Sequence, residues 1–325
     1  MKPRVYVTRI IPEDILDLLR SECEVKIWPE ENIPVPREVL KKEITDVKGV
    51  FCLLTENFDA DLISSAKELK IISNMAVGYN NIDVSAATNR GIMVTNTPGV
   101  LTETTADLTF ALLMMTARRM GEAEQYLRRG EWRTWSPLLL AGQDIHNSTL
   151  GIIGLGRIGE SLVKRAKGFD MNVMYYSRTR REEKERDLGI QYRELNELLK
   201  ESDFVCVMTP YSEETKNLID LPELKLMKRK AILINTARGG IVNEMALYEA
   251  LKNGLILAAG LDVFEHEPVS INNPLLSLPN VVVLPHIGSA SVNTRRRMAL
   301  TAVNNLIQGL SGKLPDNLVN KEALK

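Results

Sequence analysis

The chain has 325 residues, enough for about two domains of ordinary size. It carries 41 Lys and Arg residues against 42 Asp and Glu residues, and the net charge of −1 argues against a protein that works mainly on nucleic acid or on an anionic membrane. An apolar content of 44% is typical of a folded protein rather than a disordered one. No apolar run approaches the roughly 18–20 residues of a membrane-spanning helix, so we expect no membrane attachment.

The first ten residues, MKPRVYVTRI, lead directly into a strand pattern and lack the apolar segment of a secretion signal. The three cysteines, Cys23, Cys52 and Cys206, are widely separated and indicate neither a disulfide framework nor a metal site. We therefore expect a cytoplasmic protein that binds no metal.

Short apolar segments alternate with helical patterns along the whole chain, which predicts β-α-β units and parallel sheets. In the first hundred residues we expect strands at 5–10, 25–28, 49–54, 71–74 and 92–95, with helices such as 12–21 and 59–66 between them. A second series of strands is expected at 150–153, 172–176, 204–208, 231–235, 257–260 and 281–284. Most are continuous runs of Val, Ile, Leu and Ala, typical of strands covered on both faces.

Two doubly wound α/β sheets are therefore expected, but the boundary between them does not lie at the middle of the chain. A long helix at 101–117 connects the two series. The final helix, 291–309, has no strand of the second sheet left to cover, so we expect it to return to the first domain. This predicts a discontinuous first domain, 1–97 with 290–325, and a second domain, 98–289.

A glycine-rich segment, GIIGLGRIG at 151–159, joins an expected strand to an expected helix at 157–167. Its Gly154, Gly156 and Gly159 have the G-x-G-x-x-G spacing. In this context the first glycine permits a tight turn, the second lets the backbone approach a pyrophosphate, and the third permits close packing. The helix N-terminus favours the negative charge of the phosphates. The alternative is a turn that merely packs, but we expect the second domain to bind a dinucleotide.

Two strands of the second series end at residues suited to anion binding or proton transfer. Arg238, in INTARGG, can hold a carboxylate through two hydrogen bonds, although a surface arginine is the alternative. His286 precedes a glycine turn, and an imidazole there can exchange a proton near neutral pH. His146 and His266 lie in polar segments and are interpreted as surface residues.

A carboxylate beside His286 would stabilise the protonated ring and fix its orientation. Two candidates, Glu265 and Glu267, lie in GLDVFEHEP, and their spacing alone does not distinguish them. Asp262, after the strand at 257–260, is interpreted either as a strand-end cap or as a contact of the cofactor amide.

The end of the strand at 172–176 predicts the choice of dinucleotide. Rossmann domains that bind NAD carry an acidic residue about 20 positions beyond the glycines, where it binds the ribose 2′-OH. Here the corresponding residues are Ser177, Arg178, Thr179, Arg180 and Arg181. Guanidinium groups can bind a 2′-phosphate through charge-assisted hydrogen bonds, so we expect NADP(H) to be preferred, with NAD(H) possible. The alternative is a solvated basic loop balanced by the glutamates that follow it.

Six segments resemble the D-isomer-specific 2-hydroxyacid dehydrogenases, in the order in which that family carries them. They are VGYNNIDV (77–84), NTPGVLTETTADL (96–108), GIIGLGRIG (151–159), INTARGGIV (234–242), AGLDVFEHEP (259–268) and LPHIGSAS (284–291). The chain resembles the glyoxylate/hydroxypyruvate reductases in particular, on CLLTE (52–56), GEWRTWSPLLLAG (130–142) and the segment 286–310.

The resemblance implies reduction of a small 2-oxoacid, glyoxylate or hydroxypyruvate, to glycolate or D-glycerate by NAD(P)H. Arg238 would bind the carboxylate and carbonyl of the substrate, and His286 would donate the proton with Glu267 as its partner. The backbone N–H groups of Val77 and Gly78 would also bind the carboxylate.

The same resemblance implies that 1–97 with 290–325 form a discontinuous, flavodoxin-like substrate domain and that 98–289 form a Rossmann cofactor domain. Further residue roles follow from it. Leu53 would line the substrate pocket, and Ser289 would meet a terminal hydroxyl. Trp135 would reach the active site of a partner subunit in a homodimer, although an interface or core position is the alternative; Trp28 and Trp132 are interpreted as packing residues.

The expected cofactor contacts lie in the glycine turn, at strand ends and on the helix at 101–117. They are Thr105, Gly154, Leu155, Gly156, Arg157, Ile158, Gly159, Ser177, Arg178, Thr179, Thr209, Pro210, Thr215, Thr236, Ala237, Arg238, Asp262, His286 and Gly288.

Other functions compete with this interpretation. A formate dehydrogenase or a lactate dehydrogenase stays possible but would leave the TWSP segment unexplained. Phosphoglycerate dehydrogenase, of the same fold, needs cations for a phosphate, and the segments CLLTE and MAVGYN offer none. A nucleotide-sensing protein like the corepressors of this fold would retain Arg238, Glu267 and His286, so these residues do not exclude it. Turnover of a 2-oxoacid distinguishes an enzyme from such a binding protein.

Overall fold

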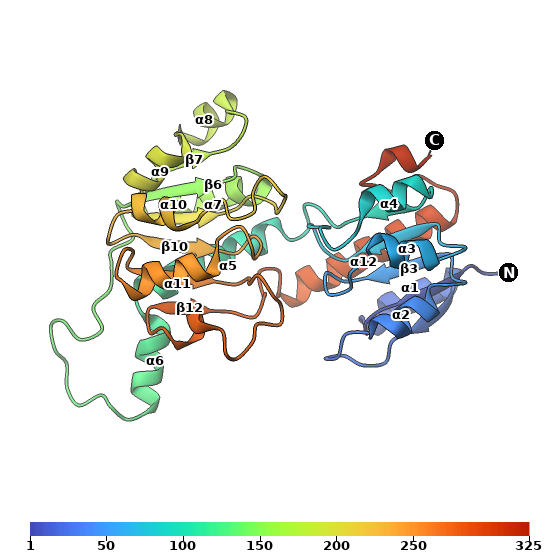
Figure 1. Cartoon of the computed structure of the whole chain (residues 1–325), viewed down its shortest axis with the longest axis horizontal. Coiled ribbons are helices and arrows are strands. Elements are labelled where there is room, and N and C mark those ends of the chain that lie inside the picture. Colours follow the sequence, from blue (N-terminus) through green and yellow to red (C-terminus); the bar gives the residue numbers. More distant parts are fainter. Residues whose placement is uncertain (325) are drawn as a thin grey trace. The chain divides into compact units, whose positions relative to one another are not determined.

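The computed structural model describes residues 1–324. The chain divides into two compact units, one formed by Met1–Leu101 and the segment that begins at Ala290, the other by Thr102–Ser289. Each unit is an α/β layer structure built on one parallel sheet (Figure 1). None of the helices in residues 1–324 is long and apolar enough to cross a membrane.

The sheet of the first unit has five parallel strands in the order β2-β1-β3-β4-β5, the flavodoxin-like order. Its strands are β1 (Arg4–Val7), β2 (Glu24–Ile27), β3 (Gly49–Cys52), β4 (Ile71–Asn74) and β5 (Met93–Thr95). The helices are α1 (Glu13–Glu22), α2 (Arg37–Glu43), α3 (Ala60–Ser65), α4 (Val84–Asn89) and α12 (Val292–Leu310), with a short 3-10 turn at Lys321–Leu324. Every residue of β3 and β4 is buried, as expected for central strands covered on both faces.

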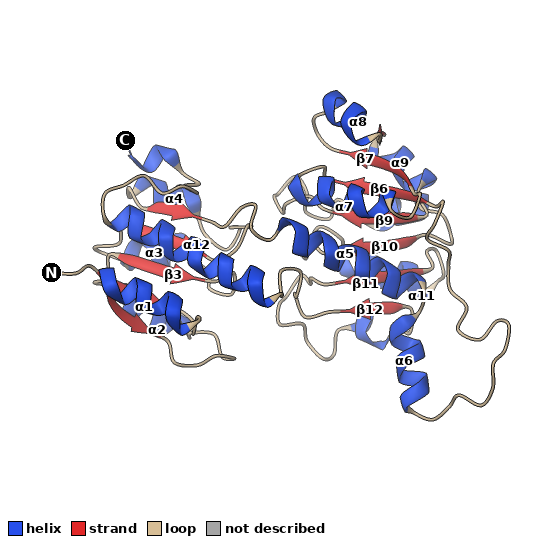
Figure 2. Ribbon diagram, turned by 180° about the vertical axis from the view of Figure 1, so that it is seen from behind, coloured by secondary structure: helices blue, strands red, loops and turns tan. Residues whose placement is uncertain are grey.

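The last long helix, α12, packs against β3, β4, β5 and α1 of the first unit (Figure 2). Glycine lets this helix lie close to the sheet: a Cβ at Gly309 would lie 2.6 Å from Cδ1 of Ile71. The chain then runs along β5, where the buried Asn320 accepts a hydrogen bond from the Val94 N–H and donates one to the Ile92 carbonyl. This tail covers the polar edge of β5, an edge that would otherwise be open.

The sheet of the second unit has seven parallel strands in the order β12-β11-β10-β9-β6-β7-β8, the Rossmann order extended by one strand. The strands are β6 (Thr149–Ile153), β7 (Asn172–Tyr176), β8 (Gln191–Tyr192), β9 (Phe204–Val207), β10 (Ile232–Asn235), β11 (Ala258–Leu261) and β12 (Val281–Val283). The helices are α5 (Thr102–Ala117), α6 (Met120–Arg128), α7 (Arg157–Lys167), α8 (Glu182–Leu188), α9 (Leu195–Glu201), α10 (Leu221–Leu226) and α11 (Glu244–Lys252), with a 3-10 turn at Pro274–Ser277.

Two apolar cores lie on opposite faces of this sheet. Helices α5 and α7 pack together on one face, and α9, α10 and α11 cover the other (Figures 1 and 2). The strand order reverses between β6 and β9, the topological switch point at which open α/β sheets bind ligands.

The expected fold class is confirmed, and most strands begin and end within two residues of their expected bounds. The strand expected at 5–10 ends at Val7, because the chain bends at Thr8 and Arg9, whose side chains bind Glu56. The two-residue strand β8 was not expected from its sequence.

Helix α6 and the segment that follows it project from the body of the second unit (Figure 2). The helix has no buried residue, and Trp132, Trp135 and Leu138 are 58%, 76% and 82% exposed. The interpretation of Trp132 as a packing residue is therefore wrong for the single chain, because its side chain is exposed and its indole donates to the nearby Thr134 carbonyl.

Candidate active site

The glycine turn after β6 has the geometry that a dinucleotide needs. Gly154 adopts a left-handed φ of 101°, and a Cβ there would lie 2.7 Å from the backbone nitrogen of Thr209. A Cβ at Gly159 would lie 2.7 Å from the Gly154 carbonyl oxygen, so the third glycine lets α7 approach the turn. Gly156, at the N-cap of α7, has open space around it. This space at a helix N-terminus fits a pyrophosphate.

The side chains within the turn differ in exposure. Leu155 is buried, Ile158 is half-buried and Arg157 is exposed at the first position of α7. Leu155 belongs to the apolar core under the turn, whereas Arg157 extends toward solvent.

Other expected cofactor contacts gather at the same carboxyl edge of the sheet. Thr209 and Pro210 follow β9, and the hydroxyl of Thr215 donates to the Pro210 carbonyl and accepts from the Ser212 N–H. Thr236 follows β10, and its hydroxyl lies 2.6 Å from that of Thr109 on α5.

The helix α5 also brings Thr105 to this edge. A Cβ built at Gly288 would lie 3.5 Å from the methyl carbon of Thr105, so helix and loop are in close contact. Thr105, Thr236 and Gly288 are all buried. This part of the edge, between α5 and the loops after β10 and β12, is therefore lined by threonine side chains and backbone groups.

Each arginine of the basic loop after β7 forms an ion pair with a glutamate. Arg178 pairs with Glu214, Arg180 with Glu185, and Arg181 with Glu160. Ser177 donates its hydroxyl to the Thr179 carbonyl, and Thr179 is exposed. Arg178 is the most exposed of the three arginines, with 80% of its side chain accessible. Glu214 reaches it from 36 positions away, and the sequence did not indicate this contact.

His286 and Glu267 form a short contact, with 2.6 Å between Nδ1 and Oε2. The other oxygen of Glu267 accepts the Phe264 N–H at 3.0 Å. Burial acts to raise the pKa of Glu267, but the hydrogen bond and charge of His286, the Phe264 N–H and the charge of Arg238 outweigh it, so the pKa lies below its ordinary value. The carboxylate is therefore ionised near neutral pH.

The structure distinguishes the two glutamates that the sequence left open. Glu265 and Glu244, the first residue of α11, exchange hydrogen bonds between carboxylate and backbone N–H. Glu265 therefore accepts a hydrogen bond at the N-terminus of α11. Of the two glutamates, Glu267 contacts the imidazole.

The backbone at His286 adopts a left-handed φ of 54°, which is uncommon for a residue with a side chain. Asp262 holds it there: its carbonyl accepts the His286 N–H at 2.9 Å, and its carboxylate accepts the N–H groups of Ile287 and Gly288, each at 2.8 Å. Burial raises the pKa of Asp262, while these N–H groups and the charge of His286 act to lower it. Of its two interpretations, the strand-end cap describes these contacts.

Arg238 lies half-buried in the loop after β10. Its carbonyl accepts a hydrogen bond from Asn235, and its guanidinium donates to the Ala237 carbonyl at 2.8 Å. Burial lowers the pKa of Arg238, and the charge of Glu267 acts against that shift. An arginine remains protonated even so. Gly239 lets this loop pack against the segment of Phe264, because a Cβ there would overlap the Phe264 carbonyl.

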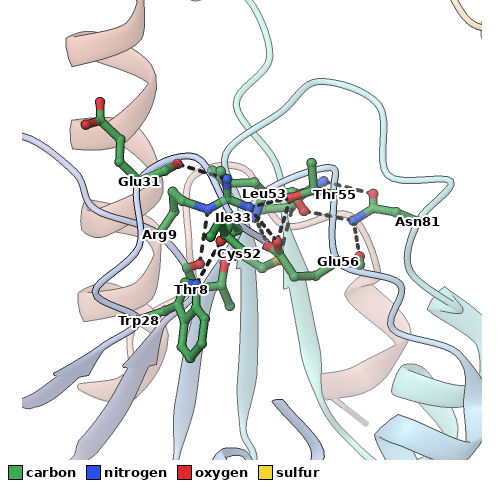
Figure 3. A network of polar contacts seen from close by, with 11 residues as sticks. Thr8, Arg9, Trp28, Glu31, Ile33, Cys52, Leu53, Thr55, Glu56 and Asn81 are labelled. Atoms are coloured by element: carbon green, nitrogen blue, oxygen red, sulfur yellow. Dashed lines mark hydrogen bonds and ion pairs between the residues drawn. The ribbon is translucent and has the colours of Figure 1, made fainter. Parts of the chain in front are cut away.

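In the first unit, the loop after β3 carries Leu53 and is held by a buried polar network (Figure 3). Glu56, 3% exposed, accepts hydrogen bonds from the Leu53 N–H at 2.9 Å and from the Thr8 hydroxyl at 2.6 Å. Arg9 pairs with the same carboxylate at 3.4 Å. This network lies between β1 and β3, the switch point of the first sheet, and occupies it with protein groups.

Asn81 joins this loop to the loop after β4. Its carboxamide donates to the carbonyls of Leu53 and Glu56 at 3.1 and 3.0 Å (Figure 3). The sequence predicts no role for Asn81; its only signal there is a polar side chain that follows a buried strand. Val77 and Gly78 lie in the same loop and are half-buried.

Ser289 and Trp135 are two further residues that the sequence predicts at the site. Ser289, half-buried, closes the loop that begins at His286. Trp135 lies in the exposed segment after α6, and its 76% exposure excludes a core position within one chain. Among residues 1–324, no group of three or more His, Cys, Asp or Glu side chains is arranged to hold a metal ion.

A family model matches more than half of the chain, and curated relatives match the whole of it. Residues 110–288 match the family model described as D-isomer specific 2-hydroxyacid dehydrogenase, NAD binding domain. The chain is 51% identical to a glyoxylate reductase of Korarchaeum cryptofilum and 50% identical to one of Pyrococcus horikoshii, in each case over the whole chain and 98% of the relative.

Solved structures agree over both units. A protein of Thermus thermophilus superposes with a TM-score of 0.91 at 45% identity, covering 97% of this chain and 99% of the other. An NADPH-dependent glyoxylate/hydroxypyruvate reductase of Sinorhizobium meliloti, solved with NADP and malonate, gives a TM-score of 0.86 at 36% identity and covers 99% and 98% of the two chains.

Proposed function

Since the chain belongs to the D-isomer specific 2-hydroxyacid dehydrogenase family, we propose that it reduces glyoxylate and hydroxypyruvate to glycolate and D-glycerate, with NADPH preferred over NADH. The observation that carries this proposal is the His286–Glu267 pair beside Arg238, in the same unit as a glycine turn that fits a pyrophosphate. Relatives named glyoxylate reductase, about half identical over the whole chain, support the choice of substrate.

Each catalytic residue of the second unit would have a separate role in the reaction. When bound, the nicotinamide cofactor supplies a hydride to the carbonyl carbon of the substrate. Arg238 would hold the substrate carboxylate and polarise the carbonyl oxygen. His286 would protonate that oxygen from Nε2, because Nδ1 faces Glu267. Glu267 would stabilise the imidazolium before transfer and keep the ring oriented.

The cofactor itself would lie along the carboxyl edge of the second sheet. The glycine turn would hold the pyrophosphate, and the hydroxyl and backbone groups of Thr209, Thr236 and their neighbours would hold the rest. Asp262 would contribute through the loop that it anchors. Leu53, Val77 and Gly78 of the first unit would contact the substrate. Ser289, the last residue of the second unit, would meet the terminal hydroxyl of hydroxypyruvate.

The preference for NADPH rests on Arg178. Its guanidinium is exposed and paired only with an exposed carboxylate, Glu214, among the bonds described for it. Exposed pairs of this kind are worth about 0–1 kcal/mol, so a 2′-phosphate can replace Glu214 as the partner. We expect kcat/KM for NADPH to exceed that for NADH by about tenfold or more, equivalent to roughly 1.4 kcal/mol.

The cofactor proposal is tested with Arg178→Ala, which should raise KM for NADPH much more than KM for NADH. Arg180→Ala is the matched control, because Arg180 is held by Glu185 and by the Tyr192 ring. A wild-type enzyme that prefers NADH, or an Arg178→Ala variant that loses both cofactors equally, contradicts the proposal.

We also propose a homodimer in the cytoplasm, in which the exposed segment after α6 wraps a second copy and Trp135 reaches its active site. The exposed side chains of Leu127, Trp132, Trp135 and Leu138 support this, since several large apolar side chains exposed within one short segment are typical of an interaction site.

The deciding experiment for the function is a substrate panel with NADPH and NADH, reported as kcat/KM. Glyoxylate and hydroxypyruvate should be the best substrates, and 3-phosphohydroxypyruvate should be poor. If no 2-oxoacid supports cofactor oxidation while the protein still binds NAD(P)H, a nucleotide-sensing binding protein is the better description.

A further inference from the structure

The loop after β4 contains Val77 and Gly78, and its successive carbonyls are all held by hydrogen bonds. The Ala76 carbonyl accepts the Thr97 N–H at 2.9 Å. The Val77 carbonyl accepts the Asn96 carboxamide at 2.8 Å, and the Gly78 carbonyl accepts the Asn74 carboxamide at 3.0 Å.

A planar trans peptide points its N–H opposite to its C=O. The Val77–Gly78 peptide is trans, since the only cis bond among residues 1–324 is Glu267–Pro268. With the Val77 carbonyl bound to Asn96, the Gly78 N–H must therefore point away from Asn96. The same argument applied to the Ala76 carbonyl fixes the direction of the Val77 N–H.

The directions of the Val77 and Gly78 N–H groups are thus fixed by the carbonyls of their own peptides. Within residues 1–324, no hydrogen bond uses the N–H of Val77 or Gly78, while the carbonyl on the other side of each peptide is bound. Two oriented, available N–H donors form an anion-binding pair.

Asn96 is itself held in place from two sides. It follows β5 directly, its N–H donates to the Asn317 carbonyl at 3.3 Å, and its carbonyl accepts the carboxamide of Asn305, a buried residue of α12, at 3.1 Å. The side chain of Asn96 therefore reaches Val77 from a backbone that cannot easily shift.

We propose that Asn96 is a positioning residue for substrate binding: its carboxamide orients the Val77–Gly78 peptide so that the Gly78 N–H can bind the substrate carboxylate. This proposal rests on the proposed function, in which that peptide contacts a 2-oxoacid. Asn74 acts in the same way on the next peptide, and Asn81 links this loop to the one held by Glu56 (Figure 3).

The test is Asn96→Asp, which keeps the shape of the side chain but removes the donor and places a carboxylate against the Val77 carbonyl. KM for glyoxylate should rise about tenfold or more, while kcat falls less than threefold and KM for NADPH stays within about twofold. The reason for this split is that Arg238, Glu267, His286 and the glycine turn are unchanged. Affinity of the NADPH-bound enzyme for oxamate, measured by cofactor fluorescence, should fall by the same factor as KM rises.

Asn320→Asp is the matched control. Asn320 is another asparagine of the first unit, buried, and donates to a backbone carbonyl, that of Ile92, but it does not contact the loop after β4. This variant should lower Tm and leave KM for glyoxylate unchanged. If Asn96→Asp does not fold, Asn96→Ser removes the same bond without adding a charge and should raise KM in the same direction.

The possible results separate the two proposals. A wild-type protein that neither reduces a 2-oxoacid nor binds oxamate overturns the proposed function. A wild-type enzyme that does both, with an Asn96 variant of unchanged KM and oxamate affinity, overturns the positioning role alone. An equal rise in KM for the Asn96 and Asn320 variants also overturns it, because the effect would then be general destabilisation.

Discussion

The imidazole of His286 is constrained through both its ring and its backbone. Glu267 binds Nδ1 at 2.6 Å, and Asp262 accepts three consecutive backbone N–H groups that begin at His286. The uncommon left-handed φ of 54° persists because these bonds outweigh its strain. Such a fixed imidazole can present Nε2 in one direction, which a proton donor requires.

Replacing His286 by Gln should leave NADPH binding intact and lower kcat by about 10²–10⁴-fold, because only proton transfer is lost. Steady-state kinetics with glyoxylate and titration of cofactor fluorescence measure the two effects. His266→Gln is the control, since His266 is exposed and is the chain neighbour of Glu267. A His286 variant with kcat near the wild-type value would remove this residue from the mechanism.

Replacing Glu267 by Gln should move the alkaline limb of the pH–kcat/KM profile for reduction to lower pH. Reduction needs the imidazolium form, and an ionised carboxylate stabilises that form whereas an amide does not. The lowered pKa of Glu267 means that it is ionised across the neutral range, so the difference applies there. An unchanged limb would show that another group sets it; Glu265→Gln should leave the profile as it is.

At the scale of elements, the segment from β6 through the turn to α7 depends on glycine for two separate reasons. Gly154 has a backbone conformation that disfavours a side chain, and it also lies against the backbone of Thr209 in the neighbouring loop. The turn is therefore shaped both by its own torsions and by β9, the strand at the switch point.

Gly154→Ala should weaken NADPH binding at least tenfold, because Thr209 would have to move away and the turn would open. Isothermal titration of the purified protein with NADPH measures this loss. Gly189→Ala is a matched control: it has a similar left-handed φ of 60° in the same unit, but the nearest atom to a Cβ there is Nζ of Lys167 at 3.5 Å. That variant should lose stability without losing affinity, and an equal loss of affinity in both would contradict the prediction.

In the whole molecule, the segment after α6 is mostly exposed when only a single chain is considered. Five large apolar side chains between Leu127 and Leu139 are at least 38% exposed. Burial of such side chains against a second copy would stabilise a dimer by about 25 cal/mol per Å² of apolar surface removed from water.

Light scattering at micromolar concentration should give twice the 36.4 kDa mass of the chain. Leu138→Glu should shift the equilibrium toward monomer, since it places a charge in the expected interface. Leu314→Glu is the control, because Leu314 is an exposed leucine of the first unit. A monomeric wild-type protein would contradict the homodimer.

Much of the fold follows from local sequence. Runs of Val, Ile and Leu predict buried strands, and the distances between them predict crossover helices, because both depend on residues that are near each other in the chain. The strands at 71–74 and 172–176 and the helix at 157–167 therefore have the expected bounds. The glycine spacing predicts its turn for the same reason, since strand, turn and helix lie within about 20 residues.

The pairing of the polar groups depends on how the chain packs, because each pair joins segments that are distant in sequence. Glu267 rather than Glu265 reaches His286 across 19 positions, Glu214 reaches Arg178 across 36, and Glu56 reaches Thr8 across 48. A carboxylate in a loop has no periodic pattern that reveals its partner, and its direction is set by neighbouring strand ends. The residue types at the site can therefore be predicted from the sequence. The hydrogen-bond partners of Asp262, Asn96 and Asn74 cannot, because only the packed sheets bring these carbonyl and N–H groups within reach.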